Sequence, residues 1–287
     1  MGFRRDDRAV SAVIGAVLVF GFLVILLSIY QAAYIPMQTE QTEFAHSKEV
    51  QNDMLELRNA ILSAEARGET TYSTVKLGTR YPVRLLGINP APAAGSLGTG
   101  PPEPISVTDG NGGSISNLCP AGDPIETRTL RYTPGYNQYG SAPTIVYENT
   151  VLYLNFSGRT ILLTDQQLVQ GNTVNVRPLN TSFYESGTDS ISVESVPGNV
   201  NEREVQDATV TFPTGLDEDT WEELLADQVD PADVTVSDGE LTVETSGRVA
   251  VSCSPTGLNE APAGGQRQPA SLEINPAGPD DVNFESV

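Results

Sequence analysis

The stretch Val10–Tyr30 reads VSAVIGAVLVFGFLVILLSIY, and the rest of the chain is organised around it. It holds 21 residues and no charged side chain. At a rise of about 1.5 Å per residue, a helix of this length spans about 31 Å, close to the hydrocarbon thickness of a bilayer. The sequence therefore predicts a transmembrane helix, which we assign to residues 10–35.

A secretory signal peptide is the competing interpretation of this run. The apolar region of such a signal is usually about 7 to 15 residues long and is followed by small residues at a cleavage site. The run in this chain is longer, and the residues after it, Gln31-Ala-Ala-Tyr34, make a weak cleavage site. Cleavage after Ala33 remains the less favoured alternative.

The charges on either side of the run predict its orientation. Arg4, Arg5 and Arg8 precede it, and Glu40 is the first charged residue after it. Positive charge tends to stay on the cytoplasmic side of a membrane. We therefore expect a single-pass protein of the cell membrane, with residues 1–9 in the cytoplasm and the C-terminal domain outside the cell.

The junction at residues 8–15, Arg-Ala-Val-Ser-Ala-Val-Ile-Gly, resembles the start of archaeal type IV pilins and archaellins. The resemblance implies that residues 1–9 are a charged leader, which a prepilin-type peptidase removes between Ala9 and Val10. It also implies that the helix serves first as a membrane anchor and later as the filament core, in contact with other pilin-like subunits. One departure is Ala12, because the family often has proline there.

The segment at residues 131–156, RYTPGYNQYGSAPTIVYENTVLYLNF, resembles uncharacterised surface proteins of halophilic archaea that carry the same pilin-like N-terminus. This resemblance extends over residues 5 to about 255. The resemblance implies a cell-surface location and no established activity.

The chain as a whole is strongly acidic, with a formal net charge of −21 and only two lysines, Lys48 and Lys76. Such a surface repels nucleic-acid phosphates, so no nucleic-acid partner is expected. It also repels anionic headgroups, so the domain is expected to stand off the membrane. An excess of carboxylates is typical of proteins that work in high salt, where screening removes their mutual repulsion. We expect a halophilic protein, with an ordinary acidic secreted protein as the alternative.

Residues 36–68 are predicted to form an amphipathic stalk helix that ends at Gly68. One apolar stripe recurs on it at helical spacing: Val50, Met54, Leu57 and Ile61. The stripe is expected to pack on the chain's own β-domain, with a helix–helix seam between subunits as the alternative. The single histidine, His46, is expected to be a solvated surface residue.

Residues 69–254 are predicted to form an extracellular β-rich domain. Apolar residues alternate with polar ones in several short runs, which favours an antiparallel sandwich or barrel: Val174 and Val176, Ile191 and Val193, Val210 and Phe212, Val249 and Val251. The pair Asp238-Gly239 suits a type I′ hairpin in which Val236 faces Leu241. The predicted fold class is therefore α+β and membrane-anchored, a long N-terminal helix followed by an antiparallel β-sandwich-like domain.

Other segments of the domain carry weaker signals. Residues 74–77 and 81–86 are expected to be short strands, and residues 217–225 a short helix. Residues 89–113, dense in proline and glycine, are expected to be a long surface loop, and residues 255–287 a disordered tail. The following cluster is expected to fill the core and cover its loops, with an aromatic patch for glycan or subunit contact as the alternative: Tyr132, Tyr136, Tyr139, Tyr147 and Tyr153.

Two kinds of covalent modification are predicted outside the membrane. Cys119 and Cys253 are a candidate disulfide closing a loop of about 134 residues, with two buried free thiols as the alternative. Asn155 and Asn180 begin Asn-X-Ser sequons and are candidate N-glycosylation sites.

The sequence contains no recognisable catalytic motif. Its only histidine lies in the stalk, and phosphate-binding loops and nucleophile elbows are absent from it. No enzyme activity, cofactor or metal is therefore predicted. Two functions remain: a structural subunit of a type IV pilus-like filament, or a single-pass surface binding protein that does not assemble. The junction at residues 8–15 favours the first. The size of the body and the long tail favour the second function or a minor subunit.

Overall fold

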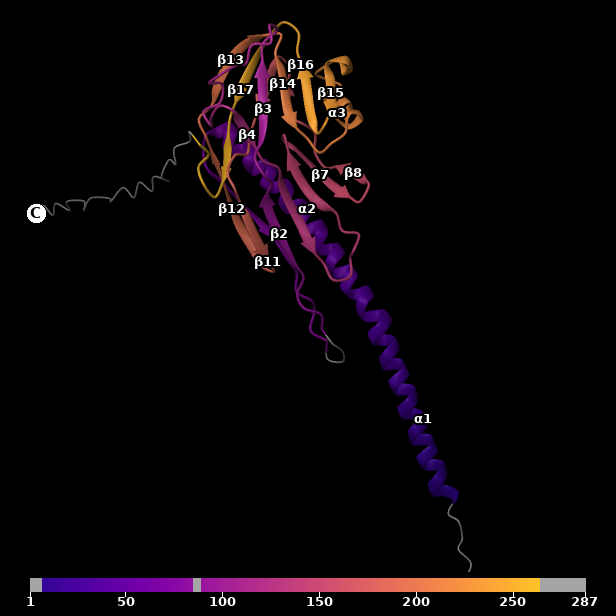
Figure 1. The fold of residues 1–287 in the computed structure, drawn as a ribbon. Coiled ribbons are helices and arrows are strands. Elements are labelled where there is room, and N and C mark those ends of the chain that lie inside the picture. Colours follow the sequence, from indigo (N-terminus) through magenta and orange to yellow (C-terminus); the bar gives the residue numbers. More distant parts are fainter. Residues whose placement is uncertain (1–6, 85–88, 264–287) are drawn as a thin grey trace, which may run out of the picture.

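The computed structural model describes residues 7–84 and 89–263, with side chains from residue 13 onward. The chain begins with one continuous helical rod that leads into a β-rich body (Figure 1). The rod comprises α1 (Asp7–Ile29), a π-helical turn (Tyr30–Tyr34) and α2 (Ile35–Arg67). The helix α1 projects away from the body, whereas α2 lies along it (Figure 1).

The rod passes Pro36 without a break. Proline has no N–H group and cannot bond the carbonyl one turn before it. The turn that precedes it is wider than an α-helical turn, because the Ile35 N–H bonds the carbonyl of Tyr30, five residues earlier. The rod ends after Arg67, where Gly68 takes a left-handed conformation and its N–H bonds the carbonyl of Ala64. The predicted stalk helix is confirmed.

In the described residues the strands form four sheets. The three-stranded sheet has the order β1 (Thr71–Lys76), β12 (Ser190–Pro197), β18 (Thr256–Leu258). The six-stranded sheet has the order β11 (Tyr184–Gly187), β2 (Ala94–Thr99), β5 (Leu130–Gly135), β6 (Thr144–Glu148), β7 (Val151–Phe156), β8 (Arg159–Leu162).

The remaining two sheets lie farther from α1 (Figure 1). The five-stranded sheet has the order β15 (Val234–Ser237), β16 (Glu240–Glu244), β14 (Thr209–Pro213), β3 (Glu103–Thr108), β4 (Ile125–Thr127). The four-stranded sheet has the order β13 (Asn201–Gln206), β17 (Arg248–Cys253), β10 (Thr173–Val176), β9 (Val169–Gln170). The helix α3 (Glu218–Leu225) and a 3₁₀ turn (Pro231–Asp233) precede β15. Strands pair antiparallel throughout these sheets, except that β10 runs parallel to β17.

Two hydrophobic clusters stabilise the body. In the first, the stripe of α2 packs on the three- and six-stranded sheets. Its four residues are fully buried, which confirms that the stripe packs on the chain's own β-domain: Val50, Met54, Leu57 and Ile61. The second cluster lies between the five- and four-stranded sheets and includes Trp221 of α3.

The strand β7 belongs to both clusters. Leu152 and Leu154 contribute to the cluster around α2, whereas Val151 and Tyr153 contribute to the other. Successive side chains of a strand point to opposite faces. The six-stranded sheet is therefore covered on both faces at β7, and the body has more layers than a simple sandwich.

The predicted hairpin is confirmed in its register. Asp238 and Gly239 both have positive φ angles, 52° and 82°, as a type I′ turn requires. In the β15–β16 pair, Val236 lies opposite Leu241 and Val234 opposite Val243.

The structure corrects three predictions about the body. Residues 81–84 form no strand. Residues 89–113 are not a loop, because they contribute β2 and β3. Residues 256–258 are not part of a tail, because they form β18, which pairs with β12. Residues 264–287 of the predicted tail lie outside the described residues.

The glycines of β2 made this strand look like part of a loop, but they have a different role. A Cβ atom at Gly95 would lie 2.2 Å from the carbonyl oxygen of Leu77 and 2.6 Å from the hydroxyl of Tyr132. That hydroxyl donates a hydrogen bond of 2.7 Å to the same carbonyl. Glycine marks a close approach between two segments here, rather than a turn.

Candidate functional site

The first candidate site is the exposed surface of α1. Its large apolar side chains between Val13 and Ile29 are each exposed over 45–69% of their area, on all sides of the helix. The hydroxyl of Ser28 donates a hydrogen bond of 2.8 Å to the carbonyl of Val24 in the same helix. Exposed apolar surfaces of this extent mark contacts with protein or membrane. By length and composition, the helix is suited to cross a membrane.

The predicted cleavage position lies at the start of this helix. Ala9 and Val10 belong to α1, but their side chains and all of residues 1–6 lie outside the described residues. Cleavage between Ala9 and Val10 therefore stays a prediction.

Two tyrosines mark the other end of the apolar surface. The rings of Tyr30 and Tyr34 stack with their centroids 5.3 Å apart. The amide of Gln38 donates a hydrogen bond of 2.8 Å to the hydroxyl of Tyr34. Tyrosines with an apolar ring and a hydrogen-bonded hydroxyl are typical of the level where hydrocarbon meets water.

A buried carboxylate joins the rod to the body. Glu43 of α2 has no exposed surface. Its oxygens accept hydrogen bonds from three successive backbone N–H groups, those of Asn137 (2.7 Å), Gln138 (2.9 Å) and Tyr139 (2.6 Å), and from the hydroxyl of Tyr81. Bonds from several N–H groups to one ionised acceptor are among the stronger interactions in proteins. Glu43 therefore fixes the loop after β5 against the helix.

The prediction that His46 is a solvated surface residue is wrong. Only 2% of its surface is exposed. Its Nδ1 lies 2.7 Å from the hydroxyl of Tyr136, one residue before the loop that Glu43 holds. Burial lowers the pKa of His46, and the positive charge of Lys76 lowers it further. The neutral imidazole is therefore favoured at this position.

Helical spacing could have identified both residues. Glu43 and His46 precede Val50 by seven and four positions, so they continue the stripe toward the N-terminus. A polar residue at a stripe position is expected to be buried and hydrogen-bonded. The polarity of His46 alone suggested an exposed residue.

Two further polar residues attach α2 to the body. Arg58 donates hydrogen bonds to the backbone carbonyls of Thr150 (2.6 Å) and Asp165 (2.9 Å). Glu65 accepts hydrogen bonds from Arg177 and from the hydroxyl of Thr256, each at 3.0 Å. Burial raises the pKa of Glu65 to about 7, although the positive charge of Arg177 acts in the opposite direction.

The tyrosine cluster has two structural roles. Tyr132, Tyr147 and Tyr153 are buried, as expected for core residues. Tyr136 and Tyr139 are only half-buried and lie at the junction with α2, where Tyr139 contacts Phe44 edge-on at 5.6 Å.

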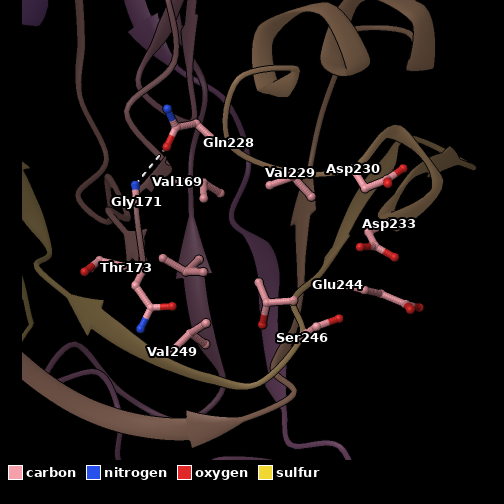
Figure 2. A pocket seen from close by; sticks show the side chains of 13 residues that line it. Val169, Gly171, Thr173, Gln228, Val229, Asp230, Asp233, Glu244, Ser246 and Val249 are labelled. Atoms are coloured by element: carbon pink, nitrogen blue, oxygen red, sulfur yellow. Dashed lines mark hydrogen bonds between the residues drawn. The ribbon is translucent and has the colours of Figure 1, made fainter.

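A small pocket of about 170 Å³ lies between β9, β10 and the segment after α3 (Figure 2). Valines form its apolar part, and Gln228 accepts a hydrogen bond of 2.8 Å from the N–H of Gly171 at its edge. Asp230, Asp233 and Glu244 contribute carboxylates (Figure 2). Within the described residues, no group of three or more His, Cys, Asp or Glu side chains could hold a metal ion. The pocket is smaller than the roughly 300 Å³ at which ligand pockets begin.

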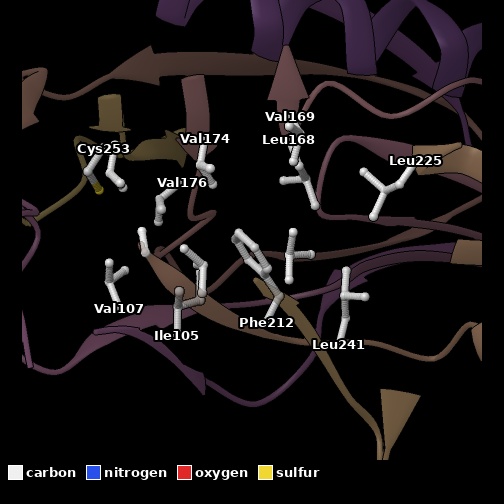
Figure 3. Close-up of a cluster of buried hydrophobic side chains, with 14 of the residues drawn as sticks. Ile105, Val107, Leu168, Val169, Val174, Val176, Phe212, Leu225, Leu241 and Cys253 are labelled. Carbon is white, nitrogen blue, oxygen red and sulfur yellow. The ribbon is translucent and has the colours of Figure 1, made fainter. Parts of the chain in front are cut away.

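The two cysteines meet in the second hydrophobic cluster. Cys119 and Cys253 form a disulfide with an S–S distance of 2.05 Å and Cα atoms 5.2 Å apart. Cys253, the last residue of β17, lies near Val174 and Val176 of β10 (Figure 3). Cys119 lies in the segment between β3 and β4 of the five-stranded sheet, so the bond ties this segment to the end of β17 in the four-stranded sheet.

The sequons differ in their surroundings. Asn155 lies within β7 and is exposed next to the turn that leads into β8, so burial does not block it. Asn180 is only partly exposed, and its side-chain oxygen is buried. Use of either sequon stays a prediction, with Asn155 the more accessible of the two.

Comparison with known proteins gives little further information. No protein-family model matches the chain, and no solved structure matches it. A protein of Archaeoglobus fulgidus, described as uncharacterized, is 24% identical over 236 residues. The matched residues cover 80% of this chain but only 40% of that relative. The chain thus spans less than half of the relative's length, and the likeness supplies neither a family nor an activity.

Proposed function

We propose that this protein is a pilin-like cell-surface protein, a minor structural subunit of a type IV pilus-like filament. One observation supports the proposal above all others. The rod is continuous, its N-terminal half exposes apolar side chains on all sides, and one face of its C-terminal half packs against the β-body. The exposed half suits a bilayer first and then a bundle of helices from other pilin-like subunits, while the body covers the outside.

The proposed location has independent support. A prepilin-type peptidase would cut between Ala9 and Val10 on the cytoplasmic side, and the body would lie outside the cell. A disulfide is favoured in an oxidising extracellular setting, and the exposed Asn155 suits a glycan. The net charge of −21 supports a halophilic host.

The second candidate is a single-pass surface protein that binds a neighbour or ligand and never assembles. The same exposed helix would then remain in the bilayer as a permanent anchor. The observation that favours this candidate is the large body of four sheets, since an abundant filament subunit is typically compact.

N-terminal sequencing distinguishes the candidates. The protein would be recovered both from membranes and from material sheared off the cell surface, with an unrelated single-pass membrane protein as the control for contamination. A chain that begins at Val10 in the sheared fraction supports the proposal. A chain that begins at Val10 only in membranes supports processing without assembly into surface filaments. An intact N-terminus confined to membranes contradicts the pilin-like reading, and a start near Tyr34 contradicts both candidates.

A further inference from the structure

The longest stretch of the chain without an acidic residue lies in the β-body. Residues 70–102 contain no Asp or Glu, although the chain has 37 of them. This run is slightly longer than the acid-free run around the transmembrane stretch, residues 8–39. It carries three basic residues, Lys76, Arg80 and Arg84. The rest of the protein is strongly acidic, whereas this stretch carries only positive charge. Its surroundings are therefore expected to differ from those of the acidic surface.

Part of this stretch extends along the rod toward α1. The backbones of Thr79 and Ala93 exchange two hydrogen bonds, of 2.9 and 3.0 Å, and so close the base of the extension. Figure 1 shows residues 79–84 and 89–93 leaving the body beside the rod, on the side from which α1 projects. The Nη2 atom of Arg84 donates a hydrogen bond of 3.2 Å to the hydroxyl of Thr39, which places Arg84 beside the first turns of α2.

The height of Arg84 can be worked out along the helix axis. Thr39 follows Tyr34 by five residues, or about 7.5 Å of helix. The polar headgroup region adds about 5–8 Å to each side of the hydrocarbon core. If the rod spans the bilayer with Tyr30 and Tyr34 at the hydrocarbon boundary, the guanidinium of Arg84 lies at the level of the lipid headgroups.

A groove of about 590 Å³ lies between α2 and residues 76–84. Its lining includes Gln38, Gln41 and Thr42 from α2, and Lys76 and Arg84 from the opposite side. Lys76 is neutralised by Glu49 of the same groove, at 2.8 Å.

Arg84 supplies the groove's uncompensated charge. It has no carboxylate within 4 Å in the part of the chain that the structure describes. Its Nε and Nη1 atoms are buried and lack an acceptor among the described residues. The bond from Nη2 to Thr39 leaves the Nε and Nη1 donors available to an acceptor that enters the groove.

We propose that this groove binds the phosphate of a membrane-lipid headgroup, with Arg84 as its charged partner. The planar guanidinium can bond two phosphate oxygens at once. The amides of Gln38 and Gln41 and the hydroxyl of Thr42 supply further polar contacts. The inference rests on the proposed membrane location of the rod. It also revises the expectation that an acidic domain stands off the bilayer, since Arg84 would lie at the level of the lipid headgroups.

Native mass spectrometry of the full chain tests the proposal. The protein would be freed of lipid in dodecyl maltoside, which has no phosphate, and titrated with phosphatidylglycerol or with an uncharged diacyl glycolipid. We expect the wild-type protein to retain one phospholipid about tenfold more tightly than Arg84→Gln, the change that corresponds to about 1.4 kcal/mol. Arg80→Gln is the matched control, because Arg80 lies on the same segment but pairs with Asp189 at 2.8 Å.

Several results would overturn the assignment. Equal phospholipid retention by the wild-type and Arg84→Gln proteins, with unchanged melting temperatures, would exclude the site, as would equal retention of the glycolipid. Binding of 50 mM inorganic phosphate without lipid, lost in Arg84→Gln, would assign the groove to a soluble anion. Loss of self-association in Arg84→Gln without a change in lipid retention would assign it to a subunit contact.

Alkaline carbonate extraction of cell membranes separates failure of the inference from failure of the proposed function. If the wild-type protein is washed off the membranes, the proposed membrane location fails and the inference fails with it. If the protein stays in the membranes and Arg84→Gln retains phospholipid like the wild type, only the inference fails.

Discussion

Removal of the disulfide between Cys119 and Cys253 should lower the free energy of unfolding by several kcal/mol. The two residues are 134 positions apart, and the bond joins the segment between β3 and β4 to β17 within one hydrophobic cluster. In the chain-entropy description, a cross-link over this distance removes about 17 cal/mol/K from the unfolded chain, or about 5 kcal/mol at 25 °C. Measured losses are often smaller than this value, so we expect about 2–5 kcal/mol for the double variant Cys119→Ala/Cys253→Ala.

The single tryptophan provides the assay. Trp221 is fully buried in the cluster that contains both cysteines, so its fluorescence reports unfolding of that cluster. Guanidinium unfolding of the full chain in detergent would be followed with and without a thiol reductant. The reductant should bring the wild-type protein close to the double variant and leave the variant unchanged. A difference below about 1 kcal/mol, or two free thiols in the unreduced wild-type protein, would refute the reasoning.

Three further predictions concern the rod and α3. Leu57→Ala should cost about 2–5 kcal/mol in chemical unfolding, because the side chain is fully buried, whereas the partly buried Leu55→Ala should cost less. Since burial raises the pKa of Glu65 from 4.5 to about 7, the folded state holds this proton more tightly than the unfolded state. The free energy of unfolding of the wild-type protein should therefore fall by up to about 3 kcal/mol relative to that of Glu65→Gln as the pH rises from about 4.5 to 7. A rise of this free energy over the same range would contradict the assignment. Asp217→Ala should cost about 1 kcal/mol in thermal unfolding, because Asp217 caps α3 through the Thr220 N–H at 2.9 Å; Asp219→Ala is the control, and equal losses would argue against the cap.

The elements that the sequence predicted well depend on neighbouring residues. The apolar helix follows from 21 successive uncharged residues, and the hairpin at Asp238-Gly239 follows from a turn with apolar alternation on both sides. The helix at residues 217–225 is likewise specified by its own cap and its own apolar face; the structure has it at Glu218–Leu225. In each case the deciding contacts are within a few positions along the chain.

The missed features depend on contacts between distant residues. Glu43 is buried because a loop 94–96 positions later supplies three N–H groups to it. The strand β18 exists because β12 offers it an edge and Glu65 accepts a hydrogen bond from Thr256. From composition alone, such segments are predicted to be a charged surface or a tail. The residues that stabilise them lie far away in the sequence, so the segments themselves give no sign of these contacts.

The polar attachments of α2 determine how the molecule carries a mechanical load. Glu43, Arg58 and Glu65 are distributed over 22 residues, about 33 Å of helix, and each bonds sideways to the body. Tension along the rod therefore acts on all three attachments and on the apolar stripe between them at once, in shear. A body held in this way resists being pulled off its helix far better than one joined at a single end, where the contacts would peel apart one after another.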